Sequence, residues 1–200
     1  MSQEIELKLV LTQALALENV IRGLKQVLPV PGLEQQPLRN IYFDTADRRL
    51  NKAEIALRIR EKNGRFIQTL KTKGAAVEGL HQRGEWEWSL ARPVLDVDVL
   101  RQHENWPGDI DPSALQPMFE TNFMRHACEV EFMSSRIELA IDIGEIIAGD
   151  RSEDLQELEL ELLSGAISDV LELGQKLKQC LPLESSDISK AERGYRLADR

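Results

Sequence analysis

The stretch EIELKLVL, residues 4–11, alternates strictly between charged and aliphatic side chains. Because successive side chains of a β-strand point to opposite faces of a sheet, the stretch predicts one strand with an ionic face and an apolar face. Glu4, Glu6 and Lys8 share the ionic face. Taken alone, such a face is typical of a solvent-exposed surface, so its meaning depends on the other strands of the chain.

Seven further segments have the composition of strands, and most of them repeat this separation of ionic from apolar side chains. Asn63 and Gly64, a dipeptide that favours a tight hairpin, separate two of these segments. Apolar residues at helical spacing predict helices over 12–28 and 165–180, and a short final helix from about residue 187. The predicted strands after residue 11 cover 40–45, 55–61, 65–74, 83–90, 123–132, 136–144 and 155–163.

Closing these eight strands into a barrel would place one face of each strand in a lumen. The ionic faces carry clusters of like charge, such as Arg58 with Arg60, and the alternating Glu157, Glu159 and Glu161. Like charges side by side repel each other, whereas a bound polyanion or divalent cation would offset that repulsion. The apolar stripes of the helices also need an apolar surface to cover. We therefore predict an α+β fold: a closed eight-stranded antiparallel β-barrel with an ionic lumen and helices outside.

The composition fits a single globular domain without a membrane segment. The 200 residues are 42% hydrophobic and 30% charged, and no window approaches the roughly 18 consecutive apolar residues of a spanning helix. A net charge of −9 argues against broad nucleic-acid binding, which needs a basic face. The N-terminus lacks the layout of a secretory signal, so we expect a cytoplasmic protein with no membrane or nucleic-acid partner.

The ionic faces supply both halves of a site for a metal ion and a polyphosphate. Guanidinium groups match phosphate oxygens through paired hydrogen bonds, and lysines add point charge. Carboxylates two residues apart on one face can share a hard cation such as Mg²⁺ or Mn²⁺. Glu4 and Glu6 supply one side of such a site, and Glu157, Glu159 and Glu161 the other. The candidate phosphate-binding residues are Lys8, Arg58, Arg60, Lys71 and Arg125.

The order of these motifs resembles that of the CYTH superfamily, the triphosphate tunnel metalloenzymes. EIELK, residues 4–8, resembles the ExExK signature of that family. Seven further motifs follow in the family's order and cover nearly the whole chain. They are IYFDTAD (41–47), ALRIRE (56–61), TLKTKG (69–74), GLHQRGEWEWSL (79–90), IDIGEI (141–146), LELELLSG (158–165) and SKAERGY (189–195).

The resemblance implies a tunnel that binds triphosphate and is closed by a C-terminal plug helix. It implies metal ligation by Glu4, Glu6 and two of the three alternating glutamates. The motif LELELLSG favours Glu159 and Glu161 and leaves Glu157 open.

The remaining motifs imply roles for residues on other strands and on the final helix. Lys190 would reach the substrate from the plug helix. Glu85, Glu87 and Asp142 would orient the basic residues or reach a second metal. The residues that the resemblance assigns to catalysis are Glu4, Glu6, Lys8 and Lys190.

The resemblance also bears on domain organisation. It implies that residues 1–200 form a single CYTH domain. The sequences of residues 79–88 and 158–165 are most similar to those of bacterial inorganic triphosphatases. In those proteins a helical, histidine-rich CHAD domain often follows the CYTH domain. The chain could therefore be the N-terminal part of a longer protein with a covalently linked CHAD domain.

The activity that the resemblance favours is hydrolysis of inorganic triphosphate to pyrophosphate and phosphate with Mg²⁺ or Mn²⁺. Nucleotide or thiamine triphosphate hydrolysis and class IV adenylate cyclase chemistry are the enzymatic alternatives. A non-catalytic polyphosphate-binding module is a third reading. It is less favoured because a pure binder needs only one sign of charge, and this chain has both.

Overall fold

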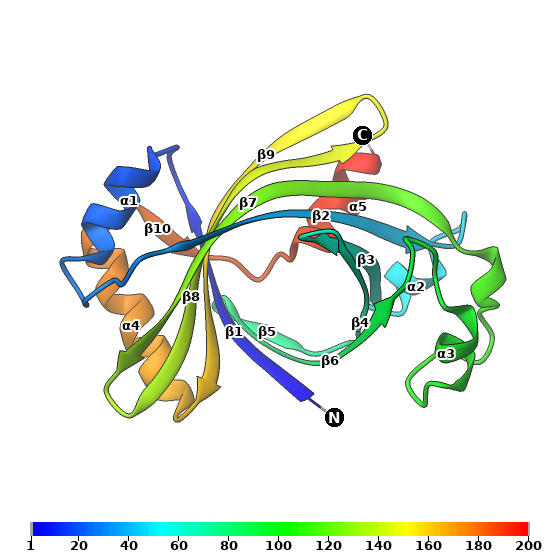
Figure 1. The fold of residues 1–200 in the computed structure, drawn as a ribbon, viewed down its shortest axis with the longest axis horizontal. Helices are drawn as coiled ribbons and strands as arrows, with labels where there is room; N and C mark the ends of the chain where they lie inside the picture. Colours follow the sequence, from blue (N-terminus) through cyan, green and yellow to red (C-terminus); the bar gives the residue numbers. More distant parts are fainter. Residues whose placement is uncertain (1, 200) are drawn as a thin grey trace.

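The computed structural model describes residues 2–199, which form a closed β-barrel with helices on its outside (Figure 1). Its strands form one sheet in the order β10-β1-β9-β8-β7-β2-β3-β4-β6-β5, and β1 also pairs with β6. This last pairing closes the eight long strands into a ring, to which the short β5 and β10 are additions. The strands are β1 (Ser2–Leu11), β2 (Glu34–Asp44), β3 (Ala56–Lys62), β4 (Arg65–Lys71), β5 (Ala75–Val77), β6 (Leu80–Leu90), β7 (Gln116–Phe132), β8 (Ser135–Ala148), β9 (Arg151–Ser164) and β10 (Leu183–Ser185).

All the pairings in this sheet are antiparallel, so the predicted eight-stranded antiparallel barrel is confirmed. Asn63 and Gly64 form the predicted hairpin between β3 and β4, both with positive φ, of 51° and 73°. Several strands are longer than predicted, and β2 and β7 extend furthest beyond the predicted bounds. The polar residues before 40 and before 123 have weak strand propensity, but each segment pairs with the predicted part of the other strand. Residues 34–38 lie opposite 123–127, and residues 116–121 lie opposite 40–44.

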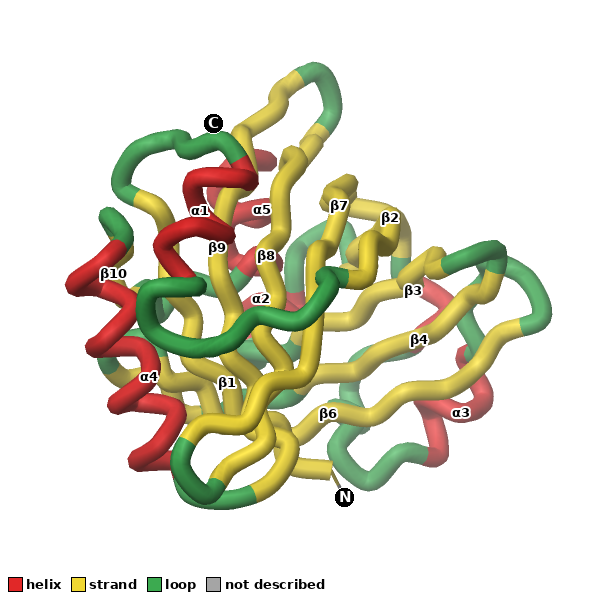
Figure 2. Tube along the Cα trace, turned by 60° about the vertical axis from the view of Figure 1, so that its left-hand side comes forward, coloured by secondary structure: helices red, strands yellow, loops and turns green. Residues whose placement is uncertain are grey.

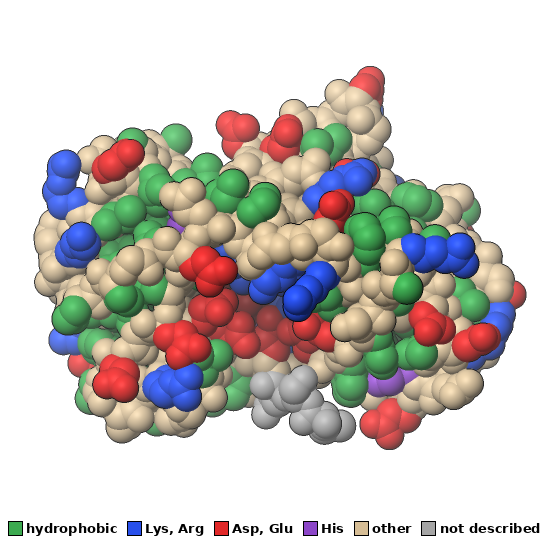
Figure 3. All heavy atoms as spheres, in the orientation of Figure 1, with side chains coloured by type: hydrophobic (Ala, Val, Ile, Leu, Met, Phe, Trp, Pro, Cys, Tyr) green, Lys and Arg blue, Asp and Glu red, His purple; other side chains and the backbone are tan. Residues whose placement is uncertain are grey.

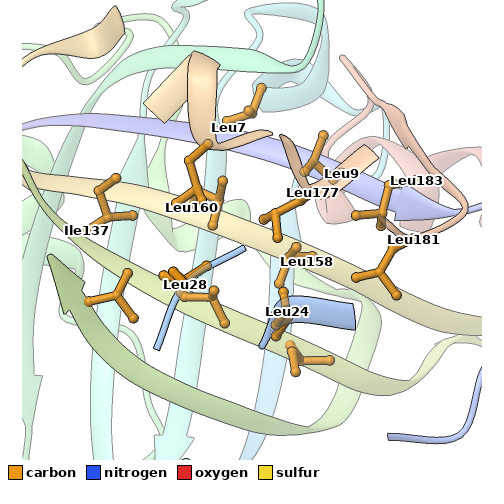
Figure 4. Close-up of a cluster of buried hydrophobic side chains, with 14 of the residues drawn as sticks. Leu7, Leu9, Leu24, Leu28, Ile137, Leu158, Leu160, Leu177, Leu181 and Leu183 are labelled. Atoms are coloured by element: carbon orange, nitrogen blue, oxygen red, sulfur yellow. The ribbon is translucent and has the colours of Figure 1, made fainter. Parts of the chain in front are cut away.

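Helices cover the apolar side of β1, β8 and β9, as the sequence predicted. The helices are α1 (Leu17–Leu24), α2 (Arg49–Lys52), α3 (Val97–Gln102), α4 (Ile167–Cys180) and α5 (Lys190–Ala198), with a 3₁₀ turn at Pro112–Ala114. Figure 2 shows α1 and α4 side by side on the outside of the barrel. Leu7, Leu9 and Leu158 point away from the lumen and pack against Leu24 and Leu177 of these helices (Figure 4).

All three predicted helices begin later in the chain than predicted, and for two of them the reason can be identified. Residues 12–16 do not join α1, because Thr12 continues the β1 edge by donating its backbone N–H to the carbonyl of Pro182. The final helix begins at Lys190, because Ser189 is its N-cap. The Ser189 side chain accepts a hydrogen bond from the N–H of Glu192, as in a Ser-x-x-Glu capping box. None of the helices within residues 2–199 is long and apolar enough to cross a membrane.

Helix α5 is fixed against the barrel by close packing. The ring of Tyr195 meets the ring of Phe119 edge to face, with 5.0 Å between centroids. A Cβ atom at Gly194 would lie 2.1 Å from the Phe119 ring, so only glycine lets the helix come this close to β7. The first residue of α5 is Lys190, and its side chain therefore enters the end of the lumen.

We predict that Tyr195→Phe lowers the free energy of unfolding by about 1.5–3 kcal/mol, the usual range for a hydrogen bond to a charged group. The hydroxyl of Tyr195 donates to Oδ2 of Asp44 at 2.8 Å, and Asp44 is fully buried. The same carboxylate accepts the backbone N–H groups of Leu50 and Asn51, so Asp44 links α2 to α5. Urea unfolding of the two proteins measures the difference. An unchanged midpoint would show that the phenol contributes by ring packing alone.

Candidate active site

The barrel contains a cavity of about 590 Å³ whose wall is made mostly of charged side chains. In Figure 3, acidic side chains gather in the hollow at the centre of the face shown, and basic side chains lie along its upper edge. The ionic faces of the alternating strands therefore line the inside of the barrel. The predicted site residues that line the cavity are Glu4, Glu6, Lys8, Arg58, Arg60, Lys71, Glu85, Glu87, Arg125, Glu159, Glu161 and Lys190.

Two lysines meet three carboxylates at the α5 end of the cavity. The Nζ atom of Lys8 lies 2.8 Å from Glu157 and 2.5 Å from Glu159, and it is almost completely buried. Lys190 lies 2.7 Å from Asp142 and 2.8 Å from Glu159, and it also contacts Glu157. We call Asp142, Glu157 and Glu159 the lysine-bound triad.

Arg125 completes the charge balance of the lysine-bound triad. Its guanidinium donates two hydrogen bonds of 2.8 Å to Asp142 and one of 2.5 Å to Glu159. Burial alone raises the pKa of Glu159, but Lys190, Lys8 and Arg125 outweigh burial and hold that pKa well below its usual value. Three cations thus face three carboxylates.

The lysine-bound triad also has the spacing of a metal site. One carboxylate oxygen from each of Asp142, Glu157 and Glu159 lies within 4.8 Å of the others. The ammonium groups of Lys8 and Lys190 already contact these oxygens, so a metal ion would have to compete with both. The predicted role of Glu157 and Glu159 as metal ligands therefore stays a prediction, and the structure shows them binding lysines.

A second acidic group, which we call the carboxylate cluster, consists of Glu4, Glu6, Glu138 and Glu161. Glu161 of β9 lies opposite Glu6 of β1 and opposite Glu138 of β8 in the strand register. Within residues 2–199, Glu161 makes no hydrogen bond or ion pair. Burial and the charges of Glu4, Glu138 and Glu6 raise the pKa of Glu161 to about 7. Negative charge is therefore in excess here.

The carboxylate cluster is only partly neutralised by cations. Glu4 accepts from Lys71 at 2.6 Å and from Arg83 at 2.9 Å. Arg83 also reaches Glu6, at 3.3 Å, while Lys71 is shared with Glu85, at 3.2 Å. Desolvation opposes the charge of Glu4, but Lys71 and Arg83 outweigh it and lower the pKa of Glu4.

Arg58 and Arg60 of β3 form the most cationic part of the wall. Arg58 lies 3.6 Å from Glu85, and its buried Nε has no hydrogen-bond partner within the described chain. Arg60 is in no ion pair among the described residues. Burial, with Arg58 and Arg125 nearby, lowers the pKa of Arg60 to about 10. These guanidinium groups lack the close carboxylates that bind the lysines.

The structure adds residues that the sequence analysis did not name. Arg83 lies on the same face of β6 as Glu85 and Glu87, so the alternation could have identified it. Glu138 shares its face of β8 with Asp142 in the same way. Glu87 is the most exposed of the predicted site residues, and it accepts a hydrogen bond of 3.2 Å from Thr69.

Among curated proteins, an inorganic triphosphatase from Haemophilus influenzae is 38% identical to this chain over 206 aligned residues. The match includes all of this chain and 56% of the relative, so the chain spans little more than half the length of that protein.

Solved structures share the fold at lower identity. The Hippeastrum protein HpAC1, an adenylyl cyclase candidate described with a dominant triphosphatase activity, has a TM-score of 0.69 and 23% identity, covering 96% of this chain and 95% of its own. The PH1819 protein of Pyrococcus horikoshii has a TM-score of 0.61 and 20% identity, covering 98% of this chain and 99% of its own. At these identities the likeness shows the fold alone.

The model of the CYTH domain family matches residues 2–195, and together with the 38% identical relative this match shows that the chain belongs to the CYTH family.

Proposed function

We propose that the protein hydrolyses inorganic triphosphate to pyrophosphate and phosphate, with a divalent cation bound beside the substrate. The observation that carries the proposal is that the cavity wall has one part rich in positive charge and another rich in negative charge. Arg58 and Arg60 form a part with little counter-charge, and the carboxylate cluster forms a part with excess negative charge. A polyanion and a metal ion together would neutralise both parts. The relative from Haemophilus influenzae, named an inorganic triphosphatase, supports this substrate.

The proposed metal site is the carboxylate cluster, with Glu4, Glu6 and Glu161 as ligands and Glu138 beside them. The donor set fits a hard cation, because all its ligand atoms are carboxylate oxygens and Glu161 makes no ion pair in the described chain. Mg²⁺ and Mn²⁺ both suit such ligands. When bound, an ion of this kind polarises a phosphoryl oxygen and orients substrate and water.

The protein's own groups bind and orient the triphosphate. Guanidinium groups such as Arg58 and Arg60 can each give a phosphate two parallel hydrogen bonds, and Lys8 and Lys190 add positive charge at the α5 end. Phosphoryl transfer depends mainly on positioning and charge stabilisation, so no nucleophilic side chain is required. In this proposal the lysine-bound triad holds the two ammonium groups in place before substrate arrives.

An assay of phosphate release from triphosphate, ATP and thiamine triphosphate, with Mg²⁺, Mn²⁺ or a chelator, tests the proposal. We expect triphosphate to be the fastest substrate and the chelator to stop the reaction. Faster use of ATP with formation of cyclic AMP would instead establish a cyclase. No turnover of any substrate with either metal would leave a polyphosphate-binding module.

A further inference from the structure

Asn40 and Thr121 are uncharged polar residues in the wall of the barrel, and the proposed chemistry does not use them. Both side chains are completely buried. Asn40 of β2 lies opposite Arg60 of β3 on one side and opposite Thr121 of β7 on the other. The three residues therefore form one row across three neighbouring strands, and the row ends at the cavity with the guanidinium of Arg60.

Hydrogen bonds fix the direction of this row. The Nδ2 atom of Asn40 donates to Oγ1 of Thr121 at 3.0 Å and approaches the Thr121 carbonyl at 3.4 Å. A backbone carbonyl can only accept, so the amide nitrogen must face Thr121 and the amide oxygen must face away from it. That oxygen accepts from Nε of Arg60 at 2.8 Å. Thr121 thus orients Asn40, and Asn40 orients Arg60.

The group that orients Arg60 is neutral, whereas carboxylates orient five other cations of the cavity wall. Lys8, Lys71, Arg83, Arg125 and Lys190 each contact at least one carboxylate within 3.3 Å. Arg60 is oriented by an amide oxygen and has no carboxylate within 4 Å in residues 2–199. An amide fixes the guanidinium without cancelling its charge, whereas a carboxylate would do both.

We propose that Asn40, oriented by Thr121, is a positioning residue that holds Arg60 ready for the triphosphate while leaving the charge of its guanidinium uncancelled. The inference rests on the proposed function, since it assumes that the anion in the tunnel is the substrate. Hydrogen bonding through Nε leaves the Nη donors of Arg60 free to bind phosphate oxygens. Burial beside Arg58 and Arg125 is unfavourable for Arg60 in the empty tunnel, and a bound polyanion relieves that cost.

Asn40→Asp tests whether the neutral charge of the orienting group matters, apart from its role as hydrogen-bond acceptor. Aspartate keeps an acceptor oxygen for Arg60 in a side chain of the same size and adds a negative charge. The affinity for inorganic triphosphate, measured by calorimetry with a chelator present so that no turnover occurs, should fall by roughly tenfold to a hundredfold, the usual range for one charge-assisted contact. Arg60 gains a counter-ion while the contact to Thr121 loses its amide donor, so the thermal midpoint is measured as well, to show that the variant is folded at the temperature of the titration. Gln35→Glu, an exposed position on the same strand, makes the same change of charge and should leave the affinity within about twofold of wild type.

A double-mutant cycle tests whether Asn40 acts through Arg60. Asn40→Ala should weaken triphosphate binding in the wild-type protein and should have no further effect in an Arg60→Ala background. Thr121→Val, which removes only the hydroxyl that orients the amide, should weaken binding in the same direction by a smaller factor. If Asn40→Ala does not fold, the isosteric Asn40→Asp and Thr121→Val variants still carry the test.

Two results would overturn the inference. One is wild-type affinity in Asn40→Asp, and the other is an equal loss from Asn40→Ala with and without Arg60. A different result would refute the proposed function alone: a wild-type protein that binds triphosphate but releases no phosphate with Mg²⁺ or Mn²⁺. If the wild-type protein does not bind triphosphate, the proposed function and this inference both fail.

Discussion

Glu6→Gln is expected to abolish metal-dependent phosphate release from triphosphate while leaving the protein folded. Glu6 lies in the carboxylate cluster opposite Glu161, and its one ion-pair partner in the described chain is Arg83 at 3.3 Å. A bound metal ion supplies several kcal/mol of charge stabilisation, so loss of a ligand should lower kcat/KM by at least about a thousandfold. The thermal midpoint should hold or rise, because the substitution removes one of several mutually repelling charges.

Glu18→Gln is the matched control, because it makes the same chemical change on the exposed face of α1. Its activity should equal that of wild type. Binding of Mn²⁺, followed by calorimetry, should be weakened by Glu6→Gln and unaffected by Glu18→Gln. Near-normal activity in Glu6→Gln would show that the metal site does not include this face of β1.

Lys8→Met should cause the largest loss of stability, about 3–5 kcal/mol in the free energy of unfolding. The substitution keeps the length and apolar stem of the side chain but removes the ammonium between Glu157 and Glu159. Those buried carboxylates would then share Lys190, with Arg125 remaining at Glu159 and Arg193 3.7 Å from Glu157. Lys176→Met, at an exposed ion pair with Glu172 on α4, is the control and should change stability by less than about 0.5 kcal/mol.

The pH dependence of the Lys8→Met defect has a defined sign. In the wild-type protein the pKa of Glu159 is well below its ordinary value of 4.5. A depressed carboxyl pKa stabilises the folded state above the ordinary value, and this contribution is lost as the pH falls through the folded-state pKa. The stability difference between wild type and Lys8→Met should therefore shrink below about pH 4.5. Urea unfolding at pH 7 and pH 4 measures it, and a difference that grows in acid would contradict the assignment.

The barrel and its ionic lumen could be predicted from the sequence because strand alternation sorts side chains into two faces. Glu157, Glu159 and Glu161 could not be told apart in this way, because all three share one face. Their surroundings differ only through register: Glu159 lies opposite Lys8, whereas Glu161 lies opposite Glu6. Register joins residues about 150 positions apart, and no local pattern contains it.

Asn40 shows a second limit of sequence reasoning. It lies beside aromatic and apolar residues in β2 and carries no charge, so neither alternation nor charge clustering marks it. Its partner Thr121 is 81 positions away, and only the β2–β7 pairing brings the two together. The cytoplasmic location, the division into domains and a linked CHAD domain stay predictions.

The pairing of β1 with both β9 and β6 has a consequence for how the chain folds. Besides β6, the first strand pairs with β9 and the short β10, both of which come far later in the sequence, and Lys8 reaches Glu157 across 149 positions. Contacts of such sequence separation form slowly, and they cannot form until the ribosome has released β9. Ring closure and assembly of the charged site are therefore one event. Until it occurs, β1 has an unpaired edge and its ionic face stays in water.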